Sequence, residues 1–249
     1  MQLLTRILLV PLLLATACSF SPVSRKFEPG QEPLIVFSGT GRGTAVDLFA
    51  VSPDGGDPVQ FTFTQLRESM PRLSSRGEVV AFVRDRGGQP GEDLVVMNLL
   101  SGAERVLELP GNAGAIEALG WSSDDAFIYV RTATDTWQVR APPAPVDVTM
   151  LQSPHPAADS AFTVILGAPA FATAKECEGG GICVTGPSGE PSRIHQSGTR
   201  PFRIGGDAIG WINEGKIELR SLGPGAVRQL EWRDTTIRAI EATYADAND

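Results

Sequence analysis

Short apolar runs alternate with turn residues along almost the whole chain. From residue 34 onwards, stretches rich in Val, Ile, Leu and Phe are separated by Gly, Pro, Asp and Ser. The apolar positions do not keep the 3.6-residue period of a long amphipathic helix. Short runs of this kind, bounded by turn residues, are typical of strands, so the sequence predicts an all-β fold.

The runs recur in a fixed order. Five segments begin at Leu34, Val79, Ala126, Ala170 and Ala208, which lie 45, 47, 44 and 38 residues apart, and each is followed by two further runs. A period of about 40–45 residues with several strands per unit is typical of a β-propeller blade. The middle runs are almost continuously apolar, as expected for strands that neighbouring blades cover on both faces. We predict five blades of four antiparallel strands, with six blades as the alternative.

The two ends of this repeat complement each other. The last apolar run, which starts at Thr235, has no blade of its own, and the first blade lacks an innermost strand. Pairing the two closes the ring and leaves no open sheet edge. The C-terminal strand is therefore predicted to complete blade one.

One stretch of the repeat resembles a known family. Residues 70–107 contain a turn, an apolar strand, a strand led by Asp and a second turn, carried in order by Pro71, Ser74, Gly77, residues 79–83, residues 93–97 and Gly102. This order is similar to the repeat of TolB-type propellers, and Trp121, Ser122 and Asp124 resemble it again. The resemblance covers roughly a hundred residues, whereas those after Pro154 depart from the pattern. It implies protein binding, because that family works by docking to envelope proteins.

The first residues have the three-part pattern of an export signal. Arg6 precedes an apolar run from Ile7 to Ala15, and small residues follow up to Cys18. A membrane-spanning helix needs about 20 apolar residues, and this run is much shorter. The chain is therefore either cut as a secreted protein after Ala17 or lipidated at Cys18.

We favour lipidation. The stretch LATAC resembles a bacterial lipobox, although Ala15 stands where Leu is usual. Without lipid, an unpaired Cys18 thiol would begin a protein exported to an oxidising space. In lipoproteins of this kind, Ser19 after the cysteine favours the outer over the inner membrane. These patterns predict a signal peptide at residues 1–17, a lipidated N-terminus and polar tether at 18–33, and a propeller at 34–249.

Charge and cysteine usage narrow the chemistry. A net charge of −8 argues against nucleic-acid binding, which needs a basic face. Cys177 and Cys183 flank a glycine-rich turn between two strand-like runs, which predicts a disulfide across a hairpin. The alternatives are a reversible redox pair or a metal site. A metal site needs about four ligands, and only His155 and His195 could add imidazoles, so we expect no metal and no cofactor.

Catalytic patterns are weak in this sequence. Two histidines and no GxSxG stretch argue against a nucleophilic triad. Among the innermost strands taken from the repeat, only Glu117 is acidic, which argues against a glycosidase pair of carboxylates. The stretch GTGRG from Gly39 precedes a strand instead of a helix, so we interpret it as a hairpin loop and not as a phosphate site. We therefore expect no enzymatic activity.

Loop lengths point to one face of the propeller. Longer connections, including residues 84–92 and 152–160, share a face, and long loops on a rigid scaffold are common recognition sites. Arg42, Arg84 and Arg86 are the candidate partner-binding residues, with solvated loop charges as the alternative interpretation. The sequence thus predicts a non-catalytic, lipid-anchored scaffold or accessory subunit on the periplasmic face of a bacterial membrane, bound to an envelope or membrane protein. The alternatives are a small-ligand or glycan binder or a hydrolase using the axial funnel, and a degenerate propeller kept for spacing.

Overall fold

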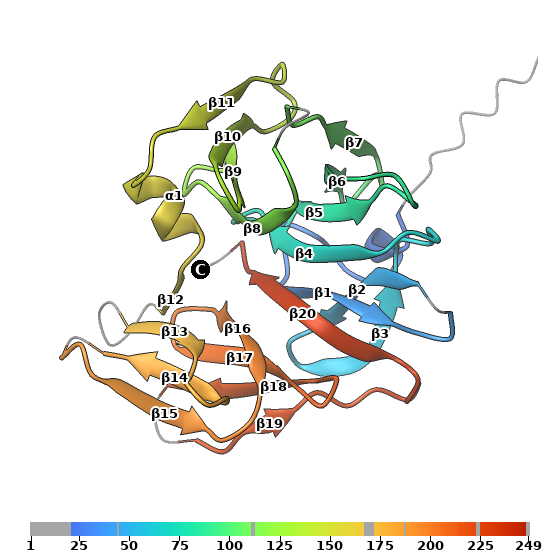
Figure 1. The fold of residues 1–249 in the computed structure, drawn as a ribbon. Helices are drawn as coiled ribbons and strands as arrows, with labels where there is room; N and C mark the ends of the chain where they lie inside the picture. The colour runs from blue at the N-terminus through green and yellow to red at the C-terminus, as the bar shows by residue number, and fades with distance from the viewer. Residues whose placement is uncertain are drawn as a thin grey trace, which may run out of the picture.

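The computed structural model describes residues 21–43, 45–110, 113–166, 172–186, 188–222 and 225–247. Their twenty strands form five four-stranded antiparallel sheets, arranged as blades around a central axis (Figure 1). The prediction of five blades is confirmed, and the alternative of six is wrong. The predicted signal peptide and Cys18 lie outside the described residues.

Each blade is a meander whose first strand in the following list lies at the axis. The blades consist of β20 (Arg238–Ala245), β1 (Leu34–Thr40), β2 (Val46–Ser52) and β3 (Gly55–Gln60); β4 (Glu68–Leu73), β5 (Val79–Asp85), β6 (Glu92–Asn98) and β7 (Glu104–Leu107); β8 (Ile116–Trp121), β9 (Phe127–Thr132), β10 (Thr136–Arg140) and β11 (Val148–Leu151); β12 (Val164–Leu166), β13 (Ala172–Glu176), β14 (Ile182–Thr185) and β15 (Pro191–His195); and β16 (Thr199–Ile204), β17 (Ala208–Asn213), β18 (Lys216–Ser221) and β19 (Arg228–Gln229).

The ring closes as the sequence predicts. β20 pairs antiparallel with β1 over seven register pairs, from Leu34 opposite Ala245 to Thr40 opposite Arg238. Figure 1 shows the C-terminal strand inside the sheet of the N-terminal strands. Blade one is therefore assembled from both ends of the described chain.

The core lies between the blades. In β5, Val80 and Phe82 pack into the cluster shared with blade one, whereas Ala81 and Val83 pack into the cluster shared with blade three. All four side chains have no exposed surface. Successive side chains of a strand point to opposite faces, so a strand between two blades needs apolar residues at every position. This requirement explains the continuous apolar runs.

The connections form two faces. We call the side with the turns at residues 74–78, 99–103, 122–126 and 222–227 the short-loop face. The opposite side carries the connections at residues 41–45, 61–67, 86–91 and 152–163, and we call it the long-loop face. The GTGRG stretch lies at the β1–β2 hairpin on the long-loop face, as predicted.

The N-terminal segment differs from the predicted polar tether. Residues 21–33 contain a 3₁₀ helix, η1 (Val23–Arg25), and Val23 and Phe27 are buried in the cluster between blades one and two. The apolar pair lies four residues apart, so one helical turn brings both side chains to the same side. The segment therefore covers the short-loop end of this blade interface instead of hanging free.

A short helix also replaces part of a predicted loop. α1 (Pro156–Ala161) follows β11, with the His155 side chain accepting a hydrogen bond from the Ala158 N–H at 3.4 Å. Proline suits the first helical position because its missing N–H would have no partner there. Within the described parts of the chain, no helix is long and apolar enough to cross a membrane.

Candidate functional site at the propeller axis

Four of the five innermost strands are irregular at the same level, close to the long-loop face. The pairing register shifts within β4, β8 and β16, and between β20 and β1. The bulged residues, which we call the bulge ring, are Met70 and Pro71, Glu117, Arg200 and Pro201, and Ile240. β-Bulges redirect side chains and are common beside binding sites, so the ring marks the axial opening on this face as a candidate site.

Backbone conformation singles out two members of the bulge ring. Met70 and Arg200 each precede a proline and have φ angles of 52°. A left-handed conformation is uncommon for residues other than glycine. Residues held in such conformations cluster at functional sites, which agrees with the position of the bulge ring at the axial opening.

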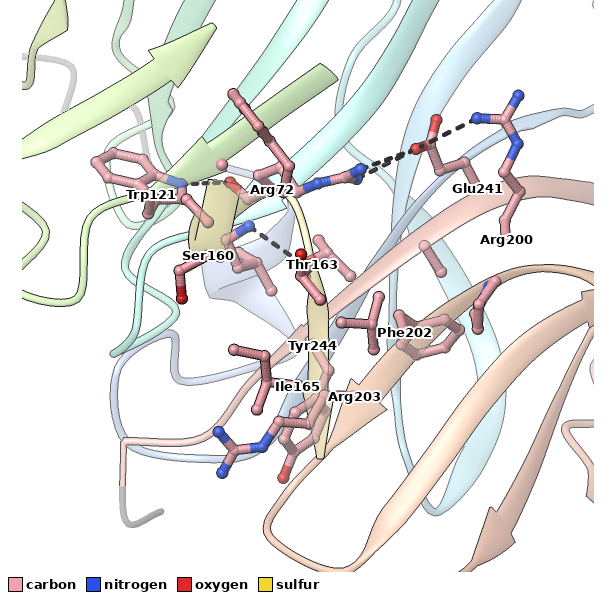
Figure 2. Close-up of a pocket in the computed structure, with 18 of the residues that line it drawn as sticks. Arg72, Trp121, Ser160, Thr163, Ile165, Arg200, Phe202, Arg203, Glu241 and Tyr244 are labelled. Atoms are coloured by element: carbon pink, nitrogen blue, oxygen red, sulfur yellow. Dashed lines mark hydrogen bonds and ion pairs between the residues drawn. The ribbon is translucent and has the colours of Figure 1, made fainter. Parts of the chain in front are cut away.

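The axis encloses a cavity of about 570 Å³. Its walls come from β4, β8, β12, β16 and β20, from the end of β13, and from α1 with the residues that follow it (Figure 2). Gly120 in β8 allows α1 to approach, because a Cβ there would meet the carbonyl oxygen of Ala161 at 2.3 Å. The helix thus fills the space beside a short β12 and narrows the cavity.

A charged network crosses the cavity. Glu241 of β20 is almost buried, and its Oε1 lies 3.2 Å from both Nη atoms of Arg72 and 3.8 Å from Nη1 of Arg200. Figure 2 shows both guanidinium groups pointing to this carboxylate. The backbone N–H of Arg200 donates a hydrogen bond to Oε1 of Glu176 at 2.9 Å. Arg200 is the more accessible arginine, with 54% of its side chain exposed against 31% for Arg72.

Aromatic residues form the other walls. The Trp121 indole N–H donates to the Arg72 carbonyl at 2.8 Å, which fixes the ring at the cavity side of β8. Phe202 and Tyr244 line the part next to blades five and one. Charged groups beside aromatic faces can bind polar partners through hydrogen bonds and ring stacking. Among the described residues, no group of three or more His, Cys, Asp or Glu side chains could hold a metal ion.

Glu241 is a residue that sequence reasoning missed. In the innermost strands predicted from the repeat, Glu117 is the only acidic residue, but it is exposed in a bulge and does not line the cavity. The signal was present, because a C-terminal run that completes blade one must itself be innermost. Glu241 could therefore have been identified as an acidic residue of an innermost strand.

The structure does not bring the three predicted arginines together. Arg42 lies in the β1–β2 loop with 85% of its side chain exposed, and its Nε is 3.2 Å from Asp234. Arg86 follows β5 and lies 2.7 Å from Asp93. The sequence predicts a loop at Arg84, but this residue lies within β5 and is mostly buried between Glu68 and Glu104. The role of these residues in partner binding stays a prediction, and Arg84 first of all holds blade two together.

The predicted disulfide is confirmed. Cys177 and Cys183 are joined across the β13–β14 turn, with their Cα atoms 5.1 Å apart. The histidines have structural contacts: His155 caps α1, and His195 packs beside Trp211, 3.5 Å from Glu218. Neither histidine lines the axial cavity.

Comparisons with known proteins give the fold. No family model matches the sequence, and no curated protein matches it at a significant level. A chain in the crystal structure of a nidogen/laminin complex is similar with a TM-score of 0.57 and 8% identity, over 86% of this chain and 99% of that chain. TolB from Acinetobacter baumannii has a TM-score of 0.42 and 14% identity, over 79% of this chain and 52% of its own. A structure from Agrobacterium tumefaciens described as TolB has a TM-score of 0.41 and 14% identity, over 83% of this chain and 70% of its own.

This chain thus spans about half the length of the Acinetobacter TolB chain and nearly all of the nidogen/laminin chain. At these identities the likeness concerns fold and not activity. The protein is a five-bladed β-propeller.

Proposed function

We propose that this protein is a non-catalytic binding propeller that docks another protein of the bacterial envelope over its axial opening on the long-loop face. It acts there as a scaffold or as an accessory subunit of a membrane complex. Lipid on Cys18 holds it at the periplasmic side of a membrane, with the outer membrane preferred. The anchor is supported by the sequence pattern of residues 1–18.

The observation that carries this proposal is the composition of the bulge ring. Ile240 is an apolar side chain with 36% exposure in a strand whose three alanines, Ala239, Ala242 and Ala245, are buried. Arg200 stands at the same level with more than half of its side chain exposed. Exposed apolar residues beside arginine are typical of protein interfaces.

The charge pairing of the cavity supports binding over catalysis. Glu241 accepts hydrogen bonds from Arg72 and from the Met70 N–H, at 3.1 Å for the latter. A general acid or base must be free to reach the proton that it transfers, whereas the Glu241 carboxylate is already occupied by these donors. The network therefore suits recognition better than proton transfer. The chain similar to this protein in the nidogen/laminin complex also belongs to an assembly of proteins.

A capture experiment with matched variants tests the docking face. The tagged lipoprotein is extracted from envelope membranes in mild detergent, and co-purifying proteins are identified by mass spectrometry. We expect Ile240→Glu to lower recovery of a stoichiometric partner at least tenfold, because a charge in an apolar contact costs more than 1.4 kcal/mol. Val227→Glu is the control, because Val227 has 39% exposure and lies on the short-loop face.

Ile240 and Val227 have similar exposed fractions, so both variants should keep the melting temperature of the parent protein. Equal loss of the partner in both variants would contradict docking on the long-loop face. A protein recovered alone over a range of detergents would remove the support for a scaffold.

A second candidate function is the binding of a small anionic ligand in the cavity. A volume of about 570 Å³ lies in the range of ligand pockets, which is roughly 300–1,000 Å³, and Arg200 adds an accessible guanidinium. Citrate and glucuronate are suitable probes. Their binding is followed by the fluorescence of Trp121, because the other three tryptophans are buried. We expect saturable quenching if this function holds, weakened about tenfold or more in Arg200→Ala. An unchanged spectrum at millimolar concentrations of both probes would count against it.

A further inference from the structure

The described chain begins at a point that is firmly attached to blade two. The Ser21 N–H donates to the carbonyl oxygen of Leu100 at 3.2 Å, and its hydroxyl donates to the carbonyl oxygen of Leu99. Ser21 itself has only 3% exposure. Val23 and Phe27 follow in the core between blades one and two. The N-terminal segment is therefore fixed to the propeller from Ser21 onwards.

Cys18 stands three residues before this attachment. An extended chain covers at most about 3.6 Å per residue, so the Cα atom of Cys18 lies within about 11 Å of that of Ser21. This limit holds for any path of the two residues between them. The proposed site of lipidation is thus confined to the surroundings of the β6–β7 turn at residues 99–103.

We infer that the short-loop face at blade two lies directly against the lipid bilayer that holds the Cys18 acyl chains. The long-loop face then points away from the membrane. This inference rests on the lipid anchor proposed above and adds the orientation of the propeller. A free tether of sixteen residues would have allowed every orientation, whereas a connection of three residues allows few.

The side chains around the attachment suit a membrane interface. Leu100 in the turn has 44% exposure, and Val146 in the neighbouring β10–β11 loop has 40%. Arg105 of β7 connects the β6–β7 hairpin to the β10–β11 loop, because its Nη1 lies 3.5 Å from the carbonyl oxygen of Ala144 in that loop. Exposed Arg25 follows Ser21 in η1. Apolar side chains next to arginine can enter the headgroup region, where the guanidinium meets lipid phosphates.

The orientation also defines the kind of partner. A strand of seven residues, such as β5, spans about 23 Å at about 3.3 Å per residue. The bulge ring therefore stands roughly 20 Å above the bilayer surface. Its partner must present a water-exposed segment at that height, and not a surface within the membrane.

Site-specific quenching tests this orientation. Leu100→Cys and Phe63→Cys are each labelled with an environment-sensitive dye in the lipidated protein, which is then reconstituted into vesicles of phosphatidylethanolamine and phosphatidylglycerol with headgroup-labelled quencher lipid. Phe63 is the control, because it has 69% exposure in the β3–β4 loop on the long-loop face. We expect at least threefold stronger quenching at position 100 than at position 63. Equal quenching at both positions, or stronger quenching at position 63, would overturn the orientation.

A second variant isolates the short connection as the cause. Twelve Gly and Ser residues inserted between residues 20 and 21 add a flexible span of about 20 Å, and should reduce the difference between the two positions to near zero. A difference that survives the insertion would overturn the role of the connection.

The mass of the N-terminal fragment shows whether Cys18 carries lipid, and so separates the proposed orientation from the proposed anchor on which it rests. Acylated Cys18 with equal quenching overturns the orientation alone, whereas Cys18 without lipid overturns the anchor and the orientation together.

Discussion

Deletion of residues 235–249 is expected to abolish cooperative folding. The truncated chain should give no thermal transition by circular dichroism and should elute as aggregate in size-exclusion chromatography. The deletion removes β20, which is the innermost strand of blade one and contacts β4 and β16 of the two neighbouring blades.

The expected effect follows from what β20 covers. Seven residues of β1 pair with it, and Leu34 to Phe37 are completely or almost completely buried. Each buried backbone group that loses its partner costs about 1–3 kcal/mol, while the whole domain is stable by only about 5–15 kcal/mol. The loss of Ala242 and Ala245 also opens two core clusters at once.

A shorter truncation serves as the control. Removal of residues 247–249 leaves every residue of β20 in place and should leave the melting temperature unchanged. A chain without residues 235–249 that still melts at the parent temperature would contradict closure of the ring by the C-terminal strand.

The repeat pattern predicts the blades because their packing imposes it. A strand between two blades must be apolar on both faces, as Val80 to Val83 are, and this demand recurs once per blade. The closing strand is predictable for the same reason, since blade one is incomplete without it. The periodic pattern of apolar residues therefore predicts most of the architecture.

Features outside this periodicity were harder to predict. α1 depends on a His155 cap and on the space that Gly120 leaves beside β8, and both are tertiary effects. The N-terminal segment contains only two buried apolar side chains, Val23 and Phe27, among polar residues. The residues of the bulge ring shift the pairing register of the innermost strands, but they share no distinct amino-acid composition. Local patterns therefore indicate the strands but not the irregular positions that shape the axial site.

Charge pairing was the least predictable feature. Arg84 and Arg86 look alike in the sequence, two residues apart in a polar stretch. In the structure, Arg84 is held by the buried Glu68, whereas Arg86 pairs with Asp93 at the surface. The difference arises because β5 continues through Asp85, which turns Arg84 into the blade.

Arg84→Ala should destabilise the protein by about 3–5 kcal/mol, because it leaves the buried carboxylate of Glu68 without its cation. Glu68 has no exposed surface, and its Oε1 lies 2.8 Å from Nη2 of Arg84. For a chain of this size, the melting temperature should fall by roughly 10 °C. Arg86→Ala is the matched control and should cost at most about 1 kcal/mol, as an exposed pair does.

The pH dependence identifies the cause. Burial raises the pKa of Glu68, while hydrogen bonds from Thr62 and Arg84 lower it. Removing Arg84 takes away one of the lowering contacts, so the pKa of Glu68 in the folded variant rises further above its unfolded value. A raised carboxyl pKa stabilises the folded state at low pH and loses this effect as the pH rises through the folded pKa. The deficit of Arg84→Ala relative to the parent protein should therefore be smaller at pH 5 than at pH 8 in urea denaturation. A deficit independent of pH would show that Arg84 acts through packing and not through the charge of Glu68.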